Sequence, residues 1–183
     1  MLAASKDNSF IRYWFVTVDE NVPKIYDTSL DFVVDTIENV LDDPLGWNQF
    51  GYFFERISAK EGLKLRGNED NWKYVLHLSL CTSKTVLKNC GFEGLSCADL
   101  KINRIYFNLT NWLHGTVQSG FNNVHLYRMY LVSHEVGHLL GRRHSTWEEN
   151  PNKKCGIMSQ QSIKPNNVHC IANVYPIESD FNV

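Results

Sequence analysis

The spacing of hydrophobic and polar residues predicts a strand followed by a helix at the start of the chain. Residues 12–18 are rich in aromatic and β-branched side chains, which favours a strand. Thr28-Ser29-Leu30-Asp31 then resembles a capping box, in which a hydroxyl side chain begins a helix. The apolar residues that follow keep helical spacing: Leu30, Val33, Val34, Ile37 and Leu41. Asp42-Asp43-Pro44 is expected to end this helix, which would pack on a sheet.

Further strands are predicted at residues 52–58, 74–80 and 101–109. The second of these alternates apolar and polar side chains, which is typical of a half-buried strand. Residues 59–71 between two of the strands are polar and are predicted to form a loop. A fifth strand is expected somewhere within residues 82–99, where the pattern is weaker.

A long helix is predicted from about Val124 to Leu140, with Asn122 or Asn123 as its cap. After Gly141 the chain is polar and contains three prolines, so no long helix is expected there. We therefore predict a single α+β domain over residues 1–183. A strand-rich upper part, about 10–141, would meet a short lower part, about 142–183, across a cleft.

The predicted long helix carries the candidate chemistry of this chain. His134 and His138 are four residues apart, so a helix would present both imidazoles on one face. Glu135 would lie close enough to reach a water at a metal without binding the metal itself. Gly141 can adopt the left-handed conformation that ends a helix, and the turn would bring His144 back as a third ligand. Three nitrogen ligands and one open position are typical of a catalytic zinc rather than a structural one.

Chance must be weighed against this interpretation. A bare His-Glu-x-x-His sequence can occur by accident on an amphipathic helix, whereas the extended pattern fixes five positions, three of them the uncommon histidine. Met158 follows at a short distance, within Cys155-Gly156-Ile157-Met158-Ser159-Gln160. It could be an ordinary core methionine, or it could lie beneath the metal.

Composition and charge narrow the functional classes. The chain has 183 residues, a formal net charge of −2 and no run of basic residues, which argues against nucleic acid or an anionic membrane as partner. No apolar stretch approaches the length of a membrane span. Residues 1–5 have neither a basic start nor an apolar core, so they do not form a secretory signal as they stand. A leader could have been removed, export could follow another route, or the protein could stay inside the cell.

The five cysteines favour an oxidising compartment. Cys90 and Cys97 flank a short glycine-containing loop, and Cys155 and Cys170 bracket the segment around Met158. Both spacings suit disulfides and hence a secreted or extracellular protein, with Cys81 left over. The alternative is five reduced thiols in a cytosolic protein.

The sequence from His134 to His144, together with Met158, resembles the signature of the metzincin zinc peptidases. A closer resemblance is to an uncharacterised family of predicted metzincin-type metallopeptidases, known mainly from bacteria and catalogued as a domain of unknown function. The matching residues are 41–47, 54–56, Cys90, Ser96, Cys97, Asn108, Trp112, 127–130, 158–161 and Cys170.

The resemblance implies a metzincin-like fold, with a twisted mixed sheet, a backing helix, an active-site helix and a short irregular C-terminal part containing a methionine turn. It implies a zinc-dependent endopeptidase with one catalytic Zn²⁺, held by His134, His138 and His144. Glu135 would be the general base and acid, and Met158 an apolar floor below the ligands. The cysteine positions in the family support the pairs Cys90–Cys97 and Cys155–Cys170.

Substrates of such enzymes add as extended strands along a sheet edge. Residues 101–109 are the candidate edge, with an interior position as the alternative. We expect a monomer that acts on a peptide or protein. Two other functional classes stay open: a metal-binding domain that holds a peptide or partner without turnover, for which Glu135 would not be needed, and a zinc hydrolase of a non-peptide amide.

Asn108-Leu109-Thr110 is a glycosylation sequon expected to be unused. The remaining histidines are interpreted as structural or exposed: His77, His114, His125 and His169.

Overall fold

The computed structural model describes residues 10–68, 71–116, 119–145, 152–163 and 170–181. Its elements run in the order β1 (Phe10–Val18), η1 (Tyr26–Thr28), α1 (Leu30–Leu41), η2 (Trp47–Phe50), β2 (Tyr52–Arg56), α2 (Ala59–Arg66), η3 (Trp72–Tyr74), β3 (Val75–Cys81), α3 (Ser83–Cys90), β4 (Cys97–Asp99), β5 (Arg104–Asn108), α4 (Leu109–His114), α5 (Val124–Leu139) and η4 (Glu178–Phe181). The η elements are short 3-10 helices.

The strands form one five-stranded sheet in the order β2-β1-β3-β5-β4. β1 pairs in parallel with β2 and β3, β3 pairs in parallel with β5, and β4 is antiparallel to β5. The expected mixed sheet is therefore confirmed. Because parallel strands alternate with crossover helices, the fold is mixed α/β rather than the α+β arrangement predicted from the sequence.

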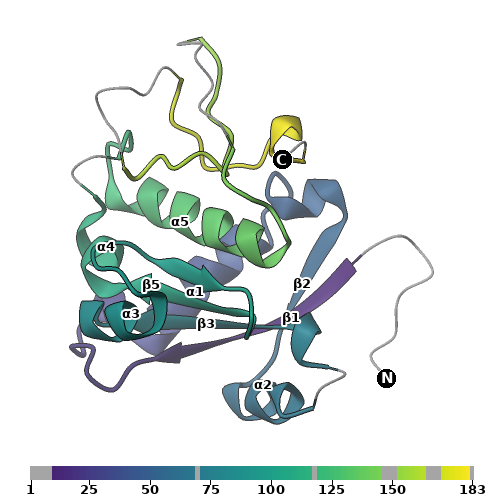
Figure 1. Cartoon of the computed structure of the whole chain (residues 1–183), viewed down its shortest axis with the longest axis vertical. Coiled ribbons are helices and arrows are strands. Elements are labelled where there is room, and N and C mark those ends of the chain that lie inside the picture. Colours follow the sequence, from purple (N-terminus) through teal and green to yellow (C-terminus); the bar gives the residue numbers. More distant parts are fainter. Residues whose placement is uncertain (1–9, 69–70, 117–118, 146–151, 164–169, 182–183) are drawn as a thin grey trace.

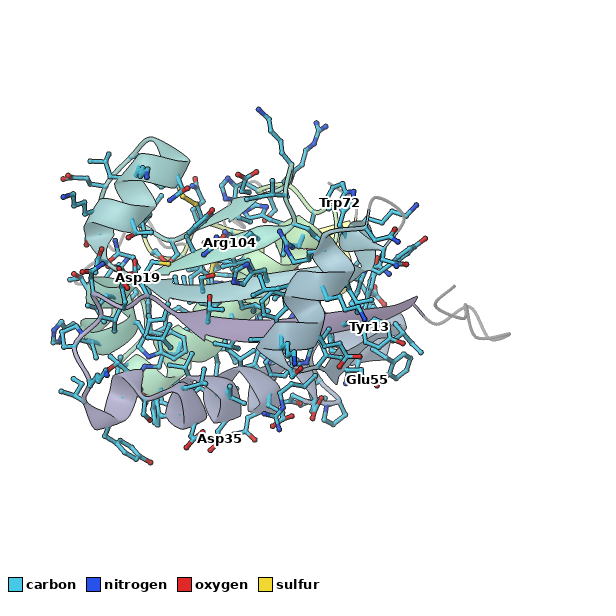
Figure 2. The ribbon with its side chains drawn as sticks, turned by 90° about the horizontal axis from the view of Figure 1, so that it is seen from below. Tyr13, Asp19, Asp35, Glu55, Trp72 and Arg104 are labelled. Atoms are coloured by element: carbon cyan, nitrogen blue, oxygen red, sulfur yellow. A yellow bond between two sulfur atoms is a disulfide. The ribbon has the colours of Figure 1, made fainter. Side chains whose placement is uncertain are left out.

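Helices cover both faces of this sheet (Figure 1). α1 and α5 pack against each other on one face, whereas α2 and α3 contact β1, β3 and β5 on the other. Figure 2, which views the molecule from below, shows α2 and α3 in front of the sheet, with Arg104 labelled between them. The main core lies between the sheet and the α1–α5 layer and includes Trp14, Leu78, Ile105, Ile37 and Val132. This layer positions α5, which carries the candidate site.

The predicted helix at residue 30 is confirmed, but its cap differs from the expectation. The Ser29 hydroxyl, and not that of Thr28, accepts the N–H of Phe32. Thr28 belongs to the preceding 3-10 turn, where its hydroxyl accepts the N–H of Ile25 and donates to the carbonyl of Pro23. The helix ends at Leu41, directly before the predicted stop.

The prediction that residues 59–71 form a loop is wrong for the first half, which is helix α2. Ser58 caps it by accepting the N–H of Glu61. Its Gly62 lies so close to the Phe15 ring that an added Cβ would be 2.2 Å from a ring carbon. Most of α2 is exposed, so its apolar pattern is weak, and the close contact at Gly62 fixes its place on the sheet.

Two further differences concern β3 and the segment that follows it. β3 was expected to be half buried, but all seven of its residues are buried because α1 and α5 cover one side and α2 and α3 the other. The expected fifth strand is present as β4, yet residues 83–90 of the same segment form helix α3, which the sequence pattern did not reveal.

Residues 101–109 take the interior position that was the alternative to the expected edge. β5 lies inside the sheet, β4 forms the edge next to it, and β2 forms the opposite edge. The N–H of His77 bonds to the carbonyl of Asn103, so the odd-numbered residues of β5 turn their backbone groups toward β3. Ala98 pairs with Ile105, one of those residues, and its own N–H and C=O therefore point away from the sheet. The outer side of β4 is paired with no other described strand.

After α5 the described chain contains no strand of the sheet and only the short helix η4. This C-terminal segment crosses above α5, on the side away from the sheet (Figure 1). An isolated bridge between Lys154 and Ile171 and a disulfide between Cys155 and Cys170 hold its parts together. No helix in the described ranges is long and apolar enough to cross a membrane.

Candidate metal centre

Helix α5 and the turn after it bring the three predicted histidine ligands together. Asn123 begins the helix by accepting the N–H of Leu126 at 2.8 Å. The helix stops at Leu139, and Gly141 adopts a φ of 87°, the left-handed conformation predicted for it. The N–H of Arg142 then bonds back to the Gly137 carbonyl, as in a Schellman turn. His144 is thereby returned to the face that carries His134 and His138.

The Nε2 atoms of these histidines converge. Nε2 of His144 lies 3.3 Å from Nε2 of His134 and 3.0 Å from Nε2 of His138. One nitrogen from each ring lies within 4.8 Å of the other two, an arrangement that could hold a metal ion. His134 is buried, His138 half-buried and His144 exposed, so the cluster opens toward solvent on one side.

The hydrogen bonds of two rings fix which nitrogen faces the centre. Nδ1 of His134 donates to the Ile157 carbonyl and Nδ1 of His138 to the Arg142 carbonyl, each at 2.8 Å. A carbonyl can only accept, so both Nδ1 atoms carry the proton and both Nε2 atoms present a lone pair. Lone pairs pointing at one centre suit a metal ion, because ligating histidines are usually oriented in this way by a partner on the other nitrogen.

The environment keeps these imidazoles neutral. Burial, with a smaller contribution from His138, lowers the pKa of His134 to about 3. Burial also lowers the pKa of His138, and burial together with His138 lowers that of His144. Neutral rings are the form that binds metal, so no proton needs to be displaced from them near neutral pH.

Glu135 is the buried acid of the site. Its side chain lines the same cavity as the three histidines and is 5% exposed. Burial raises its pKa to about 8, because the charged form loses solvation away from water. A carboxyl group with a raised pKa holds a proton more readily than one in water, which suits proton transfer.

Met158 packs against α5 at Gly137. It is fully buried, and an added Cβ on Gly137 would lie 2.5 Å from its sulfur and 2.7 Å from the Trp47 ring. Gly137 therefore allows the helix to approach this layer closely. The indole of Trp47 donates to the Ser133 carbonyl at 3.0 Å, which fixes the same stretch of helix from the side.

Two side chains of the site were not found from the sequence. The hydroxyl of Tyr130 donates to the Ser159 carbonyl and accepts the N–H of Gln161, both at 3.1 Å. The carboxylate of Asp180 accepts the N–H groups of Ile157 and Met158 at 3.0 Å each. From the sequence, Tyr130 appears only among residues 127–130 of the family resemblance, and the sequence around Asp180 has no pattern that marks it.

A cavity of about 270 Å³ adjoins the histidine cluster. The site residues lie at one side, and the remaining walls come from β4, the loop before it, α5 and the C-terminal segment. Most of those wall residues are apolar or aromatic: Phe92, Leu95, Ala98, Leu100, Tyr127, Tyr130, Leu131 and Ile163. The outward-facing strand β4 thus runs along a largely apolar hollow beside the candidate metal centre.

Both expected disulfides are present, and Cys81 is free and buried. Cys90–Cys97 joins the end of α3 to the start of β4, and Cys97 also lines the cavity. The other pair lies in the C-terminal segment, next to the Met158 turn. Burial raises the pKa of the Cys81 thiol to about 11, so it stays protonated near neutral pH.

The remaining histidines lie apart from the cluster where they are described. His77 is buried on β3, with Nε2 at 2.7 Å from the Thr17 hydroxyl and 3.0 Å from that of Ser79. His114 ends α4, His125 lies in the first turn of α5, and His169 is outside the described residues. The side chain of Asn108 is fully buried and caps α4, so the sequon is inaccessible in the folded protein.

Comparisons with known proteins give one family. No curated protein matches the chain. One similar solved structure is that of a zinc-dependent peptidase from Methanocorpusculum labreanum, with 14% sequence identity and a TM-score of 0.48 over 94% of this chain and 98% of that one. The family of proteins of unknown function DUF3152 matches residues 3–181, almost the whole sequence. The chain therefore belongs to the DUF3152 family.

Proposed function

We propose that this protein is a zinc-dependent endopeptidase of the metzincin type. The observation that carries the proposal is the convergence of the Nε2 atoms of His134, His138 and His144 beside the buried carboxyl group of Glu135. Three histidines at one centre form the ligand set of a catalytic zinc, because a fourth position stays open for the reaction.

The spacing of the histidines fits zinc. Zinc–nitrogen bonds of 2.0–2.1 Å in a tetrahedron separate the nitrogens by about 3.3 Å. The two measured separations between Nε2 atoms are 3.3 and 3.0 Å. Little movement is therefore needed to seat the ion. The ligand type agrees as well, since neutral imidazole is a preferred ligand of zinc and a poor one for calcium or magnesium.

When bound, zinc supplies a Lewis acid that polarises a peptide carbonyl and makes a water molecule more acidic. Glu135 is the residue that would take the proton of the attacking water and pass it to the nitrogen of the departing amine. Its position supports this role, because it lines the cavity while its helix neighbour His134 turns a lone pair to the centre. Met158, which packs against α5 at Gly137, would hold the imidazoles in place through packing alone.

Strand β4 supports a peptide as the substrate. The N–H and C=O of Ala98 point outward from the sheet and can pair with the backbone of an extended chain. Ala98 also lines the cavity, so a chain bound there would pass next to the histidines. One side chain of that peptide would enter the largely apolar hollow, which favours an apolar residue.

We further propose one catalytic domain over residues 1–183, with an upper part of about 10–141 and a lower part of about 142–183. The ligands support this division, since His134 and His138 belong to α5 and His144 to the segment after it. Two disulfides support work in an oxidising, extracellular setting.

The experiment compares wild type with Glu135→Gln on an unfolded protein substrate, after both are loaded with zinc. We expect wild type to cleave internal peptide bonds and the variant to lose about 100-fold or more of that rate, the usual contribution of a general base. Zinc content, measured on the same samples, should be equal. Equal rates would remove Glu135 as the base. A zinc-loaded wild type that cleaves none of a panel of unfolded proteins would leave a binding domain or a hydrolase of another amide.

A further inference from the structure

Asp180 carries a fully buried carboxylate and is not one of the three histidines of the candidate metal centre. It lies in η4, near the C-terminal end of the described chain. One oxygen, Oδ1, accepts the N–H of Met158 at 3.0 Å. The other, Oδ2, accepts the N–H of Ile157 at 3.0 Å and that of Ile177 at 2.8 Å. Three backbone donors point at its oxygens, an arrangement that suits a carboxylate.

One of these donors shares a peptide group with the acceptor of a metal-centre histidine. The N–H of Met158 and the C=O of Ile157 belong to the same planar peptide. The N–H bonds to Asp180, and the C=O accepts Nδ1–H of His134 at 2.8 Å. A continuous series of hydrogen bonds therefore runs from the Asp180 carboxylate through one peptide group to the imidazole.

We propose that Asp180 is a positioning residue for the metal centre, which acts on His134 through the peptide between Ile157 and Met158; this inference rests on the proposed zinc site. When a carboxylate accepts the N–H of a peptide group, the negative charge on the carbonyl oxygen of that peptide group increases, because hydrogen bonds in a chain polarise one another. The Ile157 carbonyl then accepts more strongly from Nδ1–H, which makes Nε2 a better ligand. Carboxylates often do this by bonding directly to a ligating histidine.

The packing around the carboxylate holds this geometry. An added Cβ on Gly156 would lie 2.5 Å from Oδ1 of Asp180, so the glycine is what lets the carboxylate reach the turn. The same turn is tied to the active-site helix from its other side by Tyr130, whose hydroxyl contacts the Ser159 carbonyl and the Gln161 N–H. The peptide that orients His134 is thus fixed between two buried side chains.

The test measures zinc affinity by competition with a chelator in wild type and Asp180→Asn. The amide keeps the size of the side chain but can accept fewer of the three N–H groups and carries no charge. We expect the dissociation constant for zinc to rise about 10-fold or more, as for other residues that orient ligating histidines. The matched control is Asn173→Ala, which removes buried hydrogen bonds to the Cys155 and Tyr175 carbonyls in the same segment but none to the Ile157–Met158 peptide.

An NMR measurement distinguishes an effect of Asp180 on His134 from a general loss of protein stability. In the zinc-loaded protein, the NMR signal of the His134 Nδ1 proton should move upfield in Asp180→Asn, because its acceptor is weaker, and stay in place in Asn173→Ala. Unchanged zinc affinity in a folded Asp180→Asn protein would overturn the inference and leave the zinc site standing. Equal loss of affinity in both variants would also overturn it. A wild type that binds no zinc would overturn both the inference and the proposed function.

If the Asp180→Asn protein does not fold, a measurement on wild type tests the proposal instead. In wild type, the backbone amides of Ile157 and Met158 should exchange hydrogen slowly, and more slowly after zinc is added, because the metal and Asp180 hold the same peptide. Exchange of these two amides at the rate of an exposed loop, with or without zinc, would contradict the proposal.

Discussion

His134 and His77 are both buried imidazoles, and burial lowers the pKa of each to about 3. Their chemistry differs because of what Nε2 faces. Nε2 of His77 lies between two hydroxyl groups that satisfy it, whereas Nε2 of His134 faces the nitrogen of another ring. Low pKa alone therefore does not identify a functional histidine in this chain. The convergence of Nε2 atoms from three rings is what distinguishes His134 from His77.

His77 gives a prediction for the dependence of stability on pH. Burial, with smaller contributions from Arg104 and Arg66, keeps its folded-state pKa near 3, while the unfolded chain has the ordinary value of 6.5. Below pH 6.5 the unfolded chain takes up a proton that the folded protein refuses, so acid favours unfolding. We expect His77 to lower the free energy of unfolding by about 1.4 kcal/mol for each pH unit between 6.5 and 4.

The measurement is urea unfolding of wild type and His77→Gln from pH 7.5 to 4, both at the same metal loading. Gln can still bond to the Thr17 and Ser79 hydroxyls but does not titrate. The stability of wild type should fall relative to that of the variant as pH falls through this range. A constant difference at all pH values would show that His77 is not held neutral.

At the scale of elements, β4 is the strand that we propose to pair with a peptide substrate. Its neighbour β5 uses one set of backbone groups for β3 and the other for β4, so at this edge of the sheet the outward backbone groups belong to β4. The disulfide from Cys97 to Cys90 on α3 anchors this short strand at its start.

Replacing Ala98 by proline tests this edge. Proline removes an N–H that points away from β5, so the pairing inside the sheet is kept. We expect KM for a peptide substrate to rise about fivefold, the value of one hydrogen bond, with a smaller change in kcat. Ala98→Ser keeps the N–H and serves as the control. An unchanged KM in a folded, zinc-loaded Ala98→Pro protein would exclude pairing at this residue.

The elements that could be predicted from the sequence are those with a strong local pattern. The strands at residues 12, 52, 74 and 101 and the helices at residues 30 and 124 all form, within a few residues of their expected ends. α2, α3 and α4 have only six to eight residues each and begin with capping side chains that are also common in turns. Strand order depends on tertiary pairing, which is why the sequence left both an edge and an interior position open for residues 101–109.

The difference between local patterns and tertiary contacts also decides which parts of the candidate site could be predicted. The geometry of His134, His138, Gly141 and His144 follows from helix spacing and one glycine turn, both of which are local. The group that orients His138 is local, since the Arg142 carbonyl lies four residues away. The group that orients His134 comes from far along the chain, because the Ile157 carbonyl is 23 residues from it. Asp180 lies a further 22 residues from Met158. Nothing in the local sequence encodes such contacts, so only the folded structure reveals them.

At the scale of the whole molecule, the histidine cluster lies where two differently built parts of the chain meet. The upper part has a sheet with helices on both faces, whereas the described C-terminal segment depends on one disulfide, one isolated bridge and buried polar side chains. α5 belongs to the first part and carries two ligands, and the segment after Gly141 supplies the third. A metal ion held by all three would therefore join the two parts and stabilise the cleft between them.

The central claim is that these three histidines hold one zinc ion, and the most direct test is the metal content of the purified protein. We would measure it by elemental mass spectrometry on wild type and His138→Ala, each purified without added metal and then dialysed against trace zinc. The account predicts about one zinc per wild-type chain and a loss of most of it in the variant, since two ligands bind zinc far more weakly than three. A folded wild type that holds no zinc and takes up none would contradict the account.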